Sequence, residues 1–318
     1  MNISKFPLLR SLLTQAILFC VVSGYGYAPA AVTLEDADSL WKFDFANTGV
    51  ASNTQIIDST GNHTANSGSL ANLSWINVPA TGPYGGPSID QLARGLAFTP
   101  KLIALDAGTN GEDSIQAAGF TSTNATVSGN ATLVTRLKWD GLVEGMNDAA
   151  GPWLLNNGLG ADSGWLFGLT TTGALNFYNA PSAVASVSRT YTPGGSNLNV
   201  GEWYDIAMVL DDLGTAGDNT GRVTFYLVGE DGTVQTFTST DNMLITNLSG
   251  GTLVVGSESL GTSTGNSRKT FRGEVDYLAM FDSALSEADV LNIFATPEPS
   301  RAFCLALGVG ALLLRRRR

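Results

Sequence analysis

The chain has 318 residues, with 28 acidic and 17 basic side chains, and a formal charge of −11 at pH 7. Seven of the basic residues lie in the first 30 and the last 23 residues, so the part between them carries a charge of about −17. Binding to phosphate needs clustered Lys and Arg, so this balance argues against nucleic acid and anionic membranes as partners. Neutral polysaccharide and divalent cations remain compatible with it.

The first 30 residues have the features of a secretory signal peptide. Lys5 and Arg10 precede an apolar stretch from Leu12 to Val22, and Ala28-Pro29-Ala30 supplies an A-x-A cleavage site. The apolar stretch is shorter than the roughly 20 residues that a membrane-spanning helix needs. We therefore predict export with cleavage after residue 30, and a permanent N-terminal anchor is the lesser alternative.

Both cysteines lie in the terminal segments, at Cys20 and Cys304. Lipidation at Cys20 is the second alternative for the N-terminus, but the bulky Phe19 stands where a lipoprotein site needs a small residue. The part between the two ends has no cysteine and cannot form a disulfide, although an exported protein could carry one. Its stability must come from a hydrophobic core or from a bound metal.

Short runs of β-branched and aromatic residues alternate with Gly, Asn and Asp clusters along the middle of the chain, which is typical of β-sandwiches and barrels. No internal repeat is visible, so we predict one domain over residues 31–295. The predicted strands are residues 40–45, 95–98, 131–139, 165–169, 174–178, 203–210, 222–228, 253–255 and 273–281.

One short helix is predicted, over Ser286 to Phe294, directly after the last strand. Ser286 is its N-cap, and Glu287 and Asp289 lie in the first turn, where acidic side chains favour a helix. Pro297 ends it.

The last 23 residues form a second targeting segment. A thirteen-residue apolar run, 302–314, is again short for a membrane span, and basic residues beside such a run resist translocation. The motif residues are Pro297, Glu298, Pro299, Arg315, Arg316, Arg317 and Arg318. Their order resembles the PEP-CTERM sorting signal. The resemblance implies an exosortase-type partner in a Gram-negative bacterium, transient inner-membrane insertion of residues 296–318, and release to the cell surface or an extracellular matrix. An ordinary tail anchor is the alternative.

The order of elements in the middle of the chain resembles the laminin-G-like, concanavalin A-like jelly rolls. The family's D-x-S-G-N type loop corresponds to Asp58-Ser-Thr-Gly-Asn62, and its W-x-x-V-A-x-V strand corresponds to Trp203–Val209. Phe271-Arg-Gly-Glu-Val-Asp276 matches the closing strand, and Ala284-Leu-Ser286 matches the start of the short helix after it. The resemblance implies an all-β, antiparallel two-sheet jelly-roll sandwich with one short C-terminal helix.

The same fold hosts glycoside hydrolases whose retaining members use E-x-D-x-x-E on one strand, since alternate side chains share a face. The chain has Glu274 and Asp276, but Ala279 stands where the acid/base carboxyl is required. His63 is the only histidine, and no G-x-S-x-G motif accompanies it. The sequence therefore predicts a protein that is not an enzyme, with a polysaccharide-active hydrolase as the alternative.

Calcium is the predicted cofactor, in a structural role. In related jelly rolls a calcium ion often joins the early loop to the closing strand, which implies Asp58, Asn62 and Asp276 as ligands here. The alternative is that Asp58 and Asn62 build an Asx-turn and that Asp276 accepts backbone hydrogen bonds. A second acidic loop, 211–219, lacks EF-hand spacing and is predicted to be a hairpin connection.

Six tryptophans could offer stacking surfaces for sugars, and Trp75, Trp153 and Trp165 lie near loops. Nothing in the sequence separates these from core residues. The prediction is thus a non-enzymatic, exported binding or structural module, with extracellular polysaccharide as a plausible partner. A protein-adhesion domain is a further alternative.

Overall fold

The computed structural model describes residues 31–43, 49–50, 56, 58–60, 72–86, 93–104, 114–123, 129–143, 151–157, 164–180, 189–213, 221–240, 243, 252–257 and 269–295. The chain divides into two compact units, Met1–Val32 and Thr33–Arg318, and all of the described strands belong to the second. The predicted signal peptide, 1–30, and the predicted sorting tail, 296–318, lie outside the described residues.

Nine of the described strands form the larger antiparallel sheet, in the order β15-β14-β13-β8-β17-β4-β3-β2, and β1 pairs with β17. Their bounds are β1 Ser39–Trp41, β2 Gly49–Val50, β3 Leu73–Asn77, β4 Arg94–Phe98, β8 Ala131–Trp139, β13 Trp203–Asp211, β14 Arg222–Val228, β15 Val234–Thr238 and β17 Gly273–Phe281. A short 3-10 turn, η2, spans Leu34–Asp36 before β1.

Six further strands form the smaller sheet, in the order β12-β11-β10-β9-β16-β7, again antiparallel. Their bounds are β7 Phe120–Thr123, β9 Trp153–Asn157, β10 Gly164–Leu169, β11 Leu175–Ala180, β12 Arg189–Tyr191 and β16 Thr252–Val255. A separate two-stranded ribbon joins β5, Lys101–Ala104, to β6, Ser114–Gln116.

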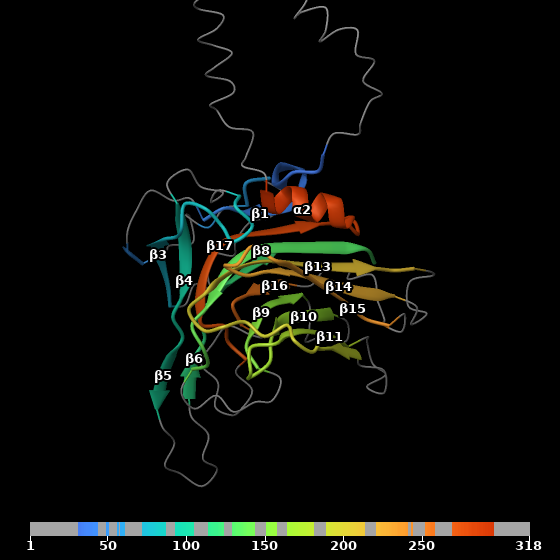
Figure 1. Cartoon of the computed structure of the whole chain (residues 1–318). Coiled ribbons are helices and arrows are strands. Elements are labelled where there is room, and N and C mark those ends of the chain that lie inside the picture. Colours follow the sequence, from blue (N-terminus) through green and yellow to red (C-terminus); the bar gives the residue numbers. More distant parts are fainter. Residues whose placement is uncertain are drawn as a thin grey trace, which may run out of the picture. The chain divides into compact units, whose positions relative to one another are not determined.

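The two sheets lie one above the other, and the hydrophobic core fills the space between them (Figure 1). Phe225 of the larger sheet contacts Phe167 of the smaller one with ring centroids 6.0 Å apart, and both rings are buried. The predicted all-β sandwich is therefore confirmed. Alternation along the strands produces it, because every second side chain faces the opposite sheet.

The longest predicted strands are the best defined. Those predicted at 131–139 and 273–281 are observed with the same bounds, as β8 and β17 at the centre of the larger sheet. The opening strand predicted at 40–45 is shorter, since β1 ends at Trp41 and Phe43 has a φ of 45°. A bulky residue with a left-handed backbone cannot continue a strand. The loop at 211–219 does connect an antiparallel hairpin, β13–β14, as predicted.

The predicted helix is confirmed as α2, Glu287–Ala295. Ser286 caps it, because its Oγ accepts the Asp289 backbone N–H at 3.2 Å while Asp289 Oδ2 accepts from the Ser286 hydroxyl at 2.6 Å. Its buried face is formed by Val290, Ile293 and Phe294. The helix lies on the outer face of the larger sheet, away from the smaller sheet (Figure 1). Within the described ranges, no helix has the length and apolar character that crossing a membrane requires.

Candidate binding site

The predicted calcium ligand Asp58 lies in a tight turn beside β1. Its Oδ1 accepts the backbone N–H groups of Leu40 at 2.8 Å and Thr60 at 3.0 Å, and the Thr60 hydroxyl bonds to both carboxylate oxygens at 2.9 Å. The bond from Thr60 N–H is an Asx-turn, which is the alternative explanation for this residue. Asn62 lies outside the described residues.

Asp276 lies at a β-bulge. The pairing of β17 with β8 shifts register between Val275 and Tyr277, so Asp276 is the extra residue of the bulge. Its side chain is buried, and its Oδ2 accepts from Arg136 Nη1 at 3.1 Å.

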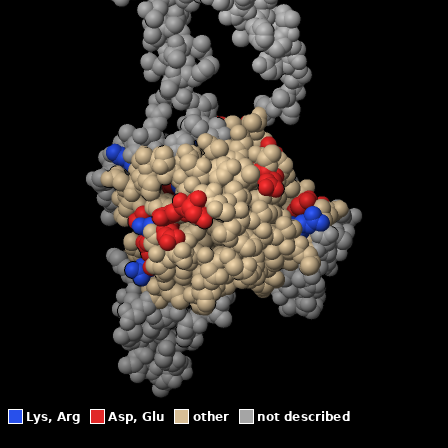
Figure 2. Space-filling view, in the orientation of Figure 1, with Lys and Arg blue, Asp and Glu red and all other residues tan. Residues whose placement is uncertain are grey.

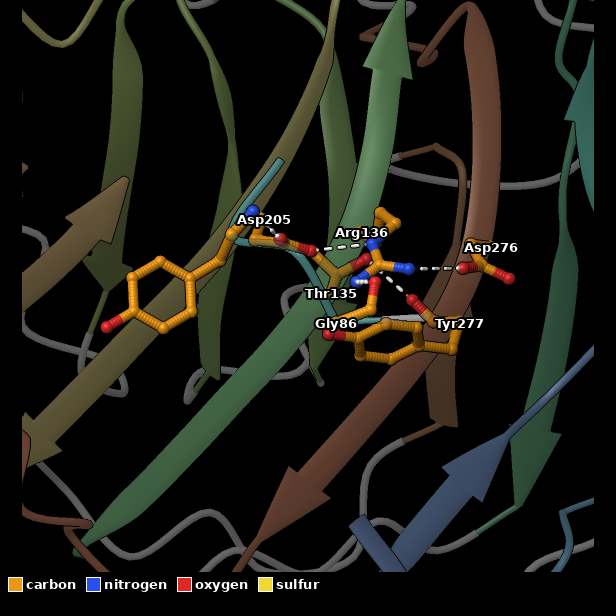
Figure 3. A network of polar contacts seen from close by, with 7 residues as sticks. Gly86, Thr135, Arg136, Asp205, Asp276 and Tyr277 are labelled. Atoms are coloured by element: carbon orange, nitrogen blue, oxygen red, sulfur yellow. Dashed lines mark hydrogen bonds and ion pairs between the residues drawn. The ribbon is translucent and has the colours of Figure 1, made fainter. Parts of the chain in front are cut away.

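Arg136 occupies the centre of a buried polar network that crosses the larger sheet. Its Nε donates to Asp205 Oδ1 at 2.6 Å, and its Nη2 donates to the Gly86 carbonyl at 3.3 Å. Figure 3 shows Asp205 and Asp276 on opposite sides of the guanidinium. The Tyr277 ring lies 5.6 Å from the Arg136 Cζ. The strand register explains this geometry, because Arg136 is the direct partner of Asp205 on one side and of Tyr277 on the other.

The loop at Thr81–Gly86 covers this network. The Tyr84 N–H donates to Asp205 Oδ2 at 3.1 Å, and the Tyr84 ring contacts Phe294 of α2, with ring centroids 6.2 Å apart. A side chain added at Gly82 would overlap the Arg136 guanidinium, and one at Gly86 would overlap the Phe294 carbonyl. The two glycines therefore permit a close approach that seals the network from solvent.

The electrostatics of the network are those of a structural element. Burial raises the pKa of Asp205, while Arg136 and the Tyr84 N–H act in the opposite direction. Burial also raises the pKa of Tyr277 far above its ordinary value. Because Arg136, Asp205 and Asp276 are all almost fully buried, they cannot reach a ligand in solution.

The contacts of Asp58 and Asp276 bear directly on the predicted calcium site. A calcium ion bridging them would have to displace the Leu40 and Thr60 donors from one carboxylate and a guanidinium from the other. The two side chains as they lie do not form a ready-made site. Among the described residues, no three His, Cys, Asp or Glu side chains gather as a metal-ligand set. Calcium binding stays a prediction.

The other residues considered from the sequence also have definite places. Glu274 bonds to Lys138 Nζ at 2.8 Å, and Asp276, its neighbour in the incomplete hydrolase motif, is closed off from solvent. Trp75, Trp153 and Trp165 are all buried, so none of them presents an open ring face to a sugar. His63 lies outside the described residues.

An open pocket of about 360 Å³ lies at one end of the larger sheet. It lies between the loop before β13 and the turn after β14, which meet because these strands are antiparallel neighbours. Its floor is Tyr204 and Leu227, both buried. Its walls are polar: Asn197, Asn199, Glu202, Glu230, Asp231 and Gln235, with Gly229 between them. Such a volume is within the range of small-ligand sites.

Hydrogen bonds hold one wall of the pocket in place. The Tyr204 hydroxyl accepts the Asn199 backbone N–H at 2.9 Å and donates to Glu202 Oε2 at 3.0 Å. The Asn199 side-chain amide donates to the same carboxylate oxygen at 2.9 Å. Burial raises the pKa of Tyr204, and the charges of Glu202 and Glu230 add to the effect. Both carboxylates therefore act on one hydroxyl, although they come from different loops.

The opposite wall is a tight turn. The Gly232 N–H donates to the Gly229 carbonyl at 2.9 Å, and Asp231 Oδ1 accepts from Thr233 N–H at 2.9 Å. Gly232 has a φ of 71°, which glycine adopts without strain. A side chain at Gly229 would come within 3.1 Å of the Tyr204 ring, so glycine keeps this side of the floor open.

Sequence reasoning did not identify the pocket. The signal was present, because Glu202 directly precedes one predicted strand and Glu230 closely follows the next. The start of one strand and the end of its antiparallel neighbour lie at the same edge of a sheet.

The profile of the concanavalin A-like lectin/glucanases superfamily matches residues 107–291, more than half of the chain. The chain therefore belongs to that superfamily. No curated protein sequence matches it.

Several solved structures are similar in fold at low identity. A SAP-like pentraxin from Limulus polyphemus shares 16% identity with a TM-score of 0.39, over 63% of this chain and 82% of its own. The Ruminococcus gnavus IT-sialidase CBM40 bound to alpha2,3 sialyllactose shares 12% with a TM-score of 0.35, over 54% and 84%. The botulinum neurotoxin serotype G binding domain shares 12% with a TM-score of 0.45, over 81% of this chain and 50% of that one. At these identities the likeness concerns the fold alone.

Proposed function

We propose that this protein is an exported, non-enzymatic binding module that holds a segment of extracellular polysaccharide in the pocket above Tyr204. The observation that carries the proposal is the pocket itself, in which six polar side chains surround a buried floor. Sugars present many hydroxyl groups and small apolar faces, and polar groups held in fixed positions can select their orientation. Membership of a superfamily of lectins and glucanases supports this ligand class.

The described part of the surface also favours a polar ligand. Among the described residues, the exposed large hydrophobic side chains are Val200 and Leu213, which lie on either side of β13 in the sequence. An apolar docking patch needs several such side chains side by side. This observation favours a sugar over a protein partner that binds through a hydrophobic face.

Binding to a glycan array, using the purified exported protein, tests the proposal. Tyr204→Phe removes the hydroxyl that links Asn199 to Glu202, so we expect a loss of affinity of about five- to tenfold, the equivalent of one hydrogen bond of about 1 kcal/mol. The matched control is Tyr226→Phe, because Tyr226 is also buried but lies on the outer face of the adjacent strand β14. Equal loss in both variants, or no binding to any glycan, would reject the pocket as the site.

A glycoside hydrolase is the second candidate, and one observation favours it. Glu202 and Glu230 approach the pocket from different loops, and glycosidases need two carboxyl groups flanking the scissile bond. Glu202 Oε2 already accepts two protein hydrogen bonds, from the Asn199 amide and the Tyr204 hydroxyl, so this oxygen is engaged within the protein. We expect no release of reducing sugar from a glycan panel. Release that Glu230→Gln abolishes would make the protein an enzyme.

Export and sorting form the other half of the proposal. The order Pro297-Glu298-Pro299, apolar run and arginine cluster supports delivery to the surface or matrix of a Gram-negative bacterium by exosortase-type machinery. Deletion of 296–318 should send the protein to the periplasm as a soluble form, and replacement of Pro297 and Pro299 by Ala should leave it in the inner membrane. Cell fractionation measures both. If both variants reach the same cell fraction as the parent protein, the tail has no sorting role.

A further inference from the structure

The pocket is negatively charged on both sides. Glu202 comes from the loop before β13, and Glu230 and Asp231 come from the turn after β14. Of the described residues that line it, none is Lys, Arg or His. Figure 2 shows several separate groups of acidic side chains on the face in view, and basic side chains lie beside some of them. A ligand in the pocket therefore meets a field of one sign.

Several hydrogen-bond donors of the walls are already engaged within the protein. The Asn197 amide nitrogen donates to the Thr172 carbonyl at 2.9 Å, and the Asn199 amide nitrogen donates to Glu202. The Tyr204 hydroxyl hydrogen is also directed to Glu202. Besides the remaining N–H groups of these amides and of Gln235, the walls offer a ligand the lone pairs of three carboxylates. These match a group that is rich in donors and positively charged, such as an ammonium with three N–H donors and no acceptor.

From these two features we infer that the pocket selects sugars bearing free amino groups, such as segments of a deacetylated glucosamine polymer. This inference rests on the proposed function, because it names the ligand class of the same pocket. Ligands of the opposite charge are disfavoured, since a uronate or a sialic acid would place its carboxylate beside three others. Like charges at such distances cost binding energy even near solvent.

The test compares two probes that share one backbone, oligomers of β-1,4-linked glucosamine and the same oligomers fully N-acetylated, by titration calorimetry of the purified exported protein. At low salt we expect the amino form to bind about tenfold more tightly, which corresponds to the gain of one or two partly exposed ion pairs. Raising the ionic strength to about 0.5 M should remove most of the difference, because salt screens exposed charges.

Glu230→Gln should also reduce the preference to about twofold, since it removes one charge while keeping the shape of the side chain. The matched control is Asp212→Asn, with the same change of charge just past the other end of β13, about 30 Å away by strand rise. The Asp212→Asn variant should keep the tenfold preference for the amino form over the N-acetylated form.

The outcomes separate the inference from the proposed function. If the acetylated oligomers or neutral glucans bind as tightly as the amino form, the ligand class is wrong while the binding pocket stands. If Asp212→Asn lowers the preference as much as Glu230→Gln does, the effect is general charge attraction and the inference falls. If no sugar of any kind binds, both fall together.

Discussion

Arg136 on β8 and Asp205 on β13 are direct cross-strand partners, and their Nε and Oδ1 atoms lie 2.6 Å apart with both side chains almost fully buried. The pair joins two of the central strands of the larger sheet, and Asp276 extends it to a third. The Thr81–Gly86 loop and helix α2 lie over it, on the outer face of the sheet. None of the three charged residues of the network lines the candidate binding site.

Removal of the buried cation should be strongly destabilising. Arg136→Leu leaves two buried carboxylates without their guanidinium, and breaking a buried pair in this way costs about 3–5 kcal/mol of unfolding free energy. Urea unfolding followed by circular dichroism measures the loss. Lys138→Leu is the matched control on the same strand, where a partly exposed pair contributes about 1 kcal/mol or less. Similar losses in the two variants would mean that the network is not the stabilising element.

Replacing all the charges together gives a sharper test of the same network. Buried ion pairs exchanged for apolar groups of similar volume are often neutral. The triple variant Arg136→Met, Asp205→Leu, Asp276→Leu should therefore unfold at a higher urea concentration than Arg136→Leu alone. If each added substitution lowers the midpoint further, the penalty does not come from uncompensated charge.

Tyr277 carries a buried hydroxyl without a hydrogen-bond partner among the described residues. A buried polar group in this state costs about 1–3 kcal/mol, so Tyr277→Phe should leave the unfolding free energy unchanged or raise it by about 1 kcal/mol. Differential scanning calorimetry should show an equal or higher Tm. Tyr204→Phe supplies the contrast, because that hydroxyl has two partners and its removal should lower the Tm. A clear loss of stability in Tyr277→Phe would show that its hydroxyl is in fact satisfied.

Asp282 provides a pH-dependent element at the start of the turn between β17 and α2. Burial raises its pKa from the ordinary 3.8, and the Asp38 carboxylate with its hydrogen bond adds to the rise. The folded protein thus holds this proton more tightly than the unfolded chain does. The contribution to stability is fully present below the unfolded pKa and is lost as the pH rises through the folded pKa.

Asp282→Asn permanently removes the charge repulsion between residue 282 and the Asp38 carboxylate. Its Tm should exceed that of the parent at pH 7, and the advantage should shrink at pH 3, where the parent carboxyl is protonated. Thermal melts at the two pH values measure this difference. Asp212→Asn, which lies away from Asp38, should show no such pH-dependent gain. An advantage for Asp282→Asn that is the same at pH 3 and pH 7 would exclude the Asp38–Asp282 interaction as its source.

The predicted calcium site has its own test. If calcium binds only the folded protein, its addition raises the Tm. At a calcium concentration a hundredfold above Kd, the free energy of unfolding should increase by about 2.7 kcal/mol. Asp58→Asn keeps a side-chain oxygen for Leu40 and Thr60 but removes the carboxylate, so the calcium-dependent increment should disappear in it. Magnesium at the same concentration is the control ion. An unchanged Tm of the parent protein in the presence of calcium would contradict the prediction that calcium is a cofactor.

The alternation of apolar and polar residues from Leu133 to Trp139 and the run of aromatic and aliphatic residues at 203–210 were enough to predict β8 and β13 from the sequence. The last strand was predicted with its correct bounds, but the sequence did not predict which of its side chains face the core. Val275, Leu278 and Met280 face the core, while Tyr277 does not belong to the core cluster. Strict alternation would have put Val275 and Tyr277 on the same face, and only the bulge at Asp276 changes this.

The sequence by itself determined the main strands and the capped final helix, and it predicts the two targeting segments, because each depends on residues that are close together in the chain. Tertiary structure alone decided that Asp276 pairs with Arg136 and that Glu202 and Glu230 share a pocket. These contacts join positions from separate strands and loops, and strand pairing sets which of them meet. The local sequence around an Asp or Glu does not predict whether folding will place its carboxylate against a guanidinium or at the edge of an open pocket.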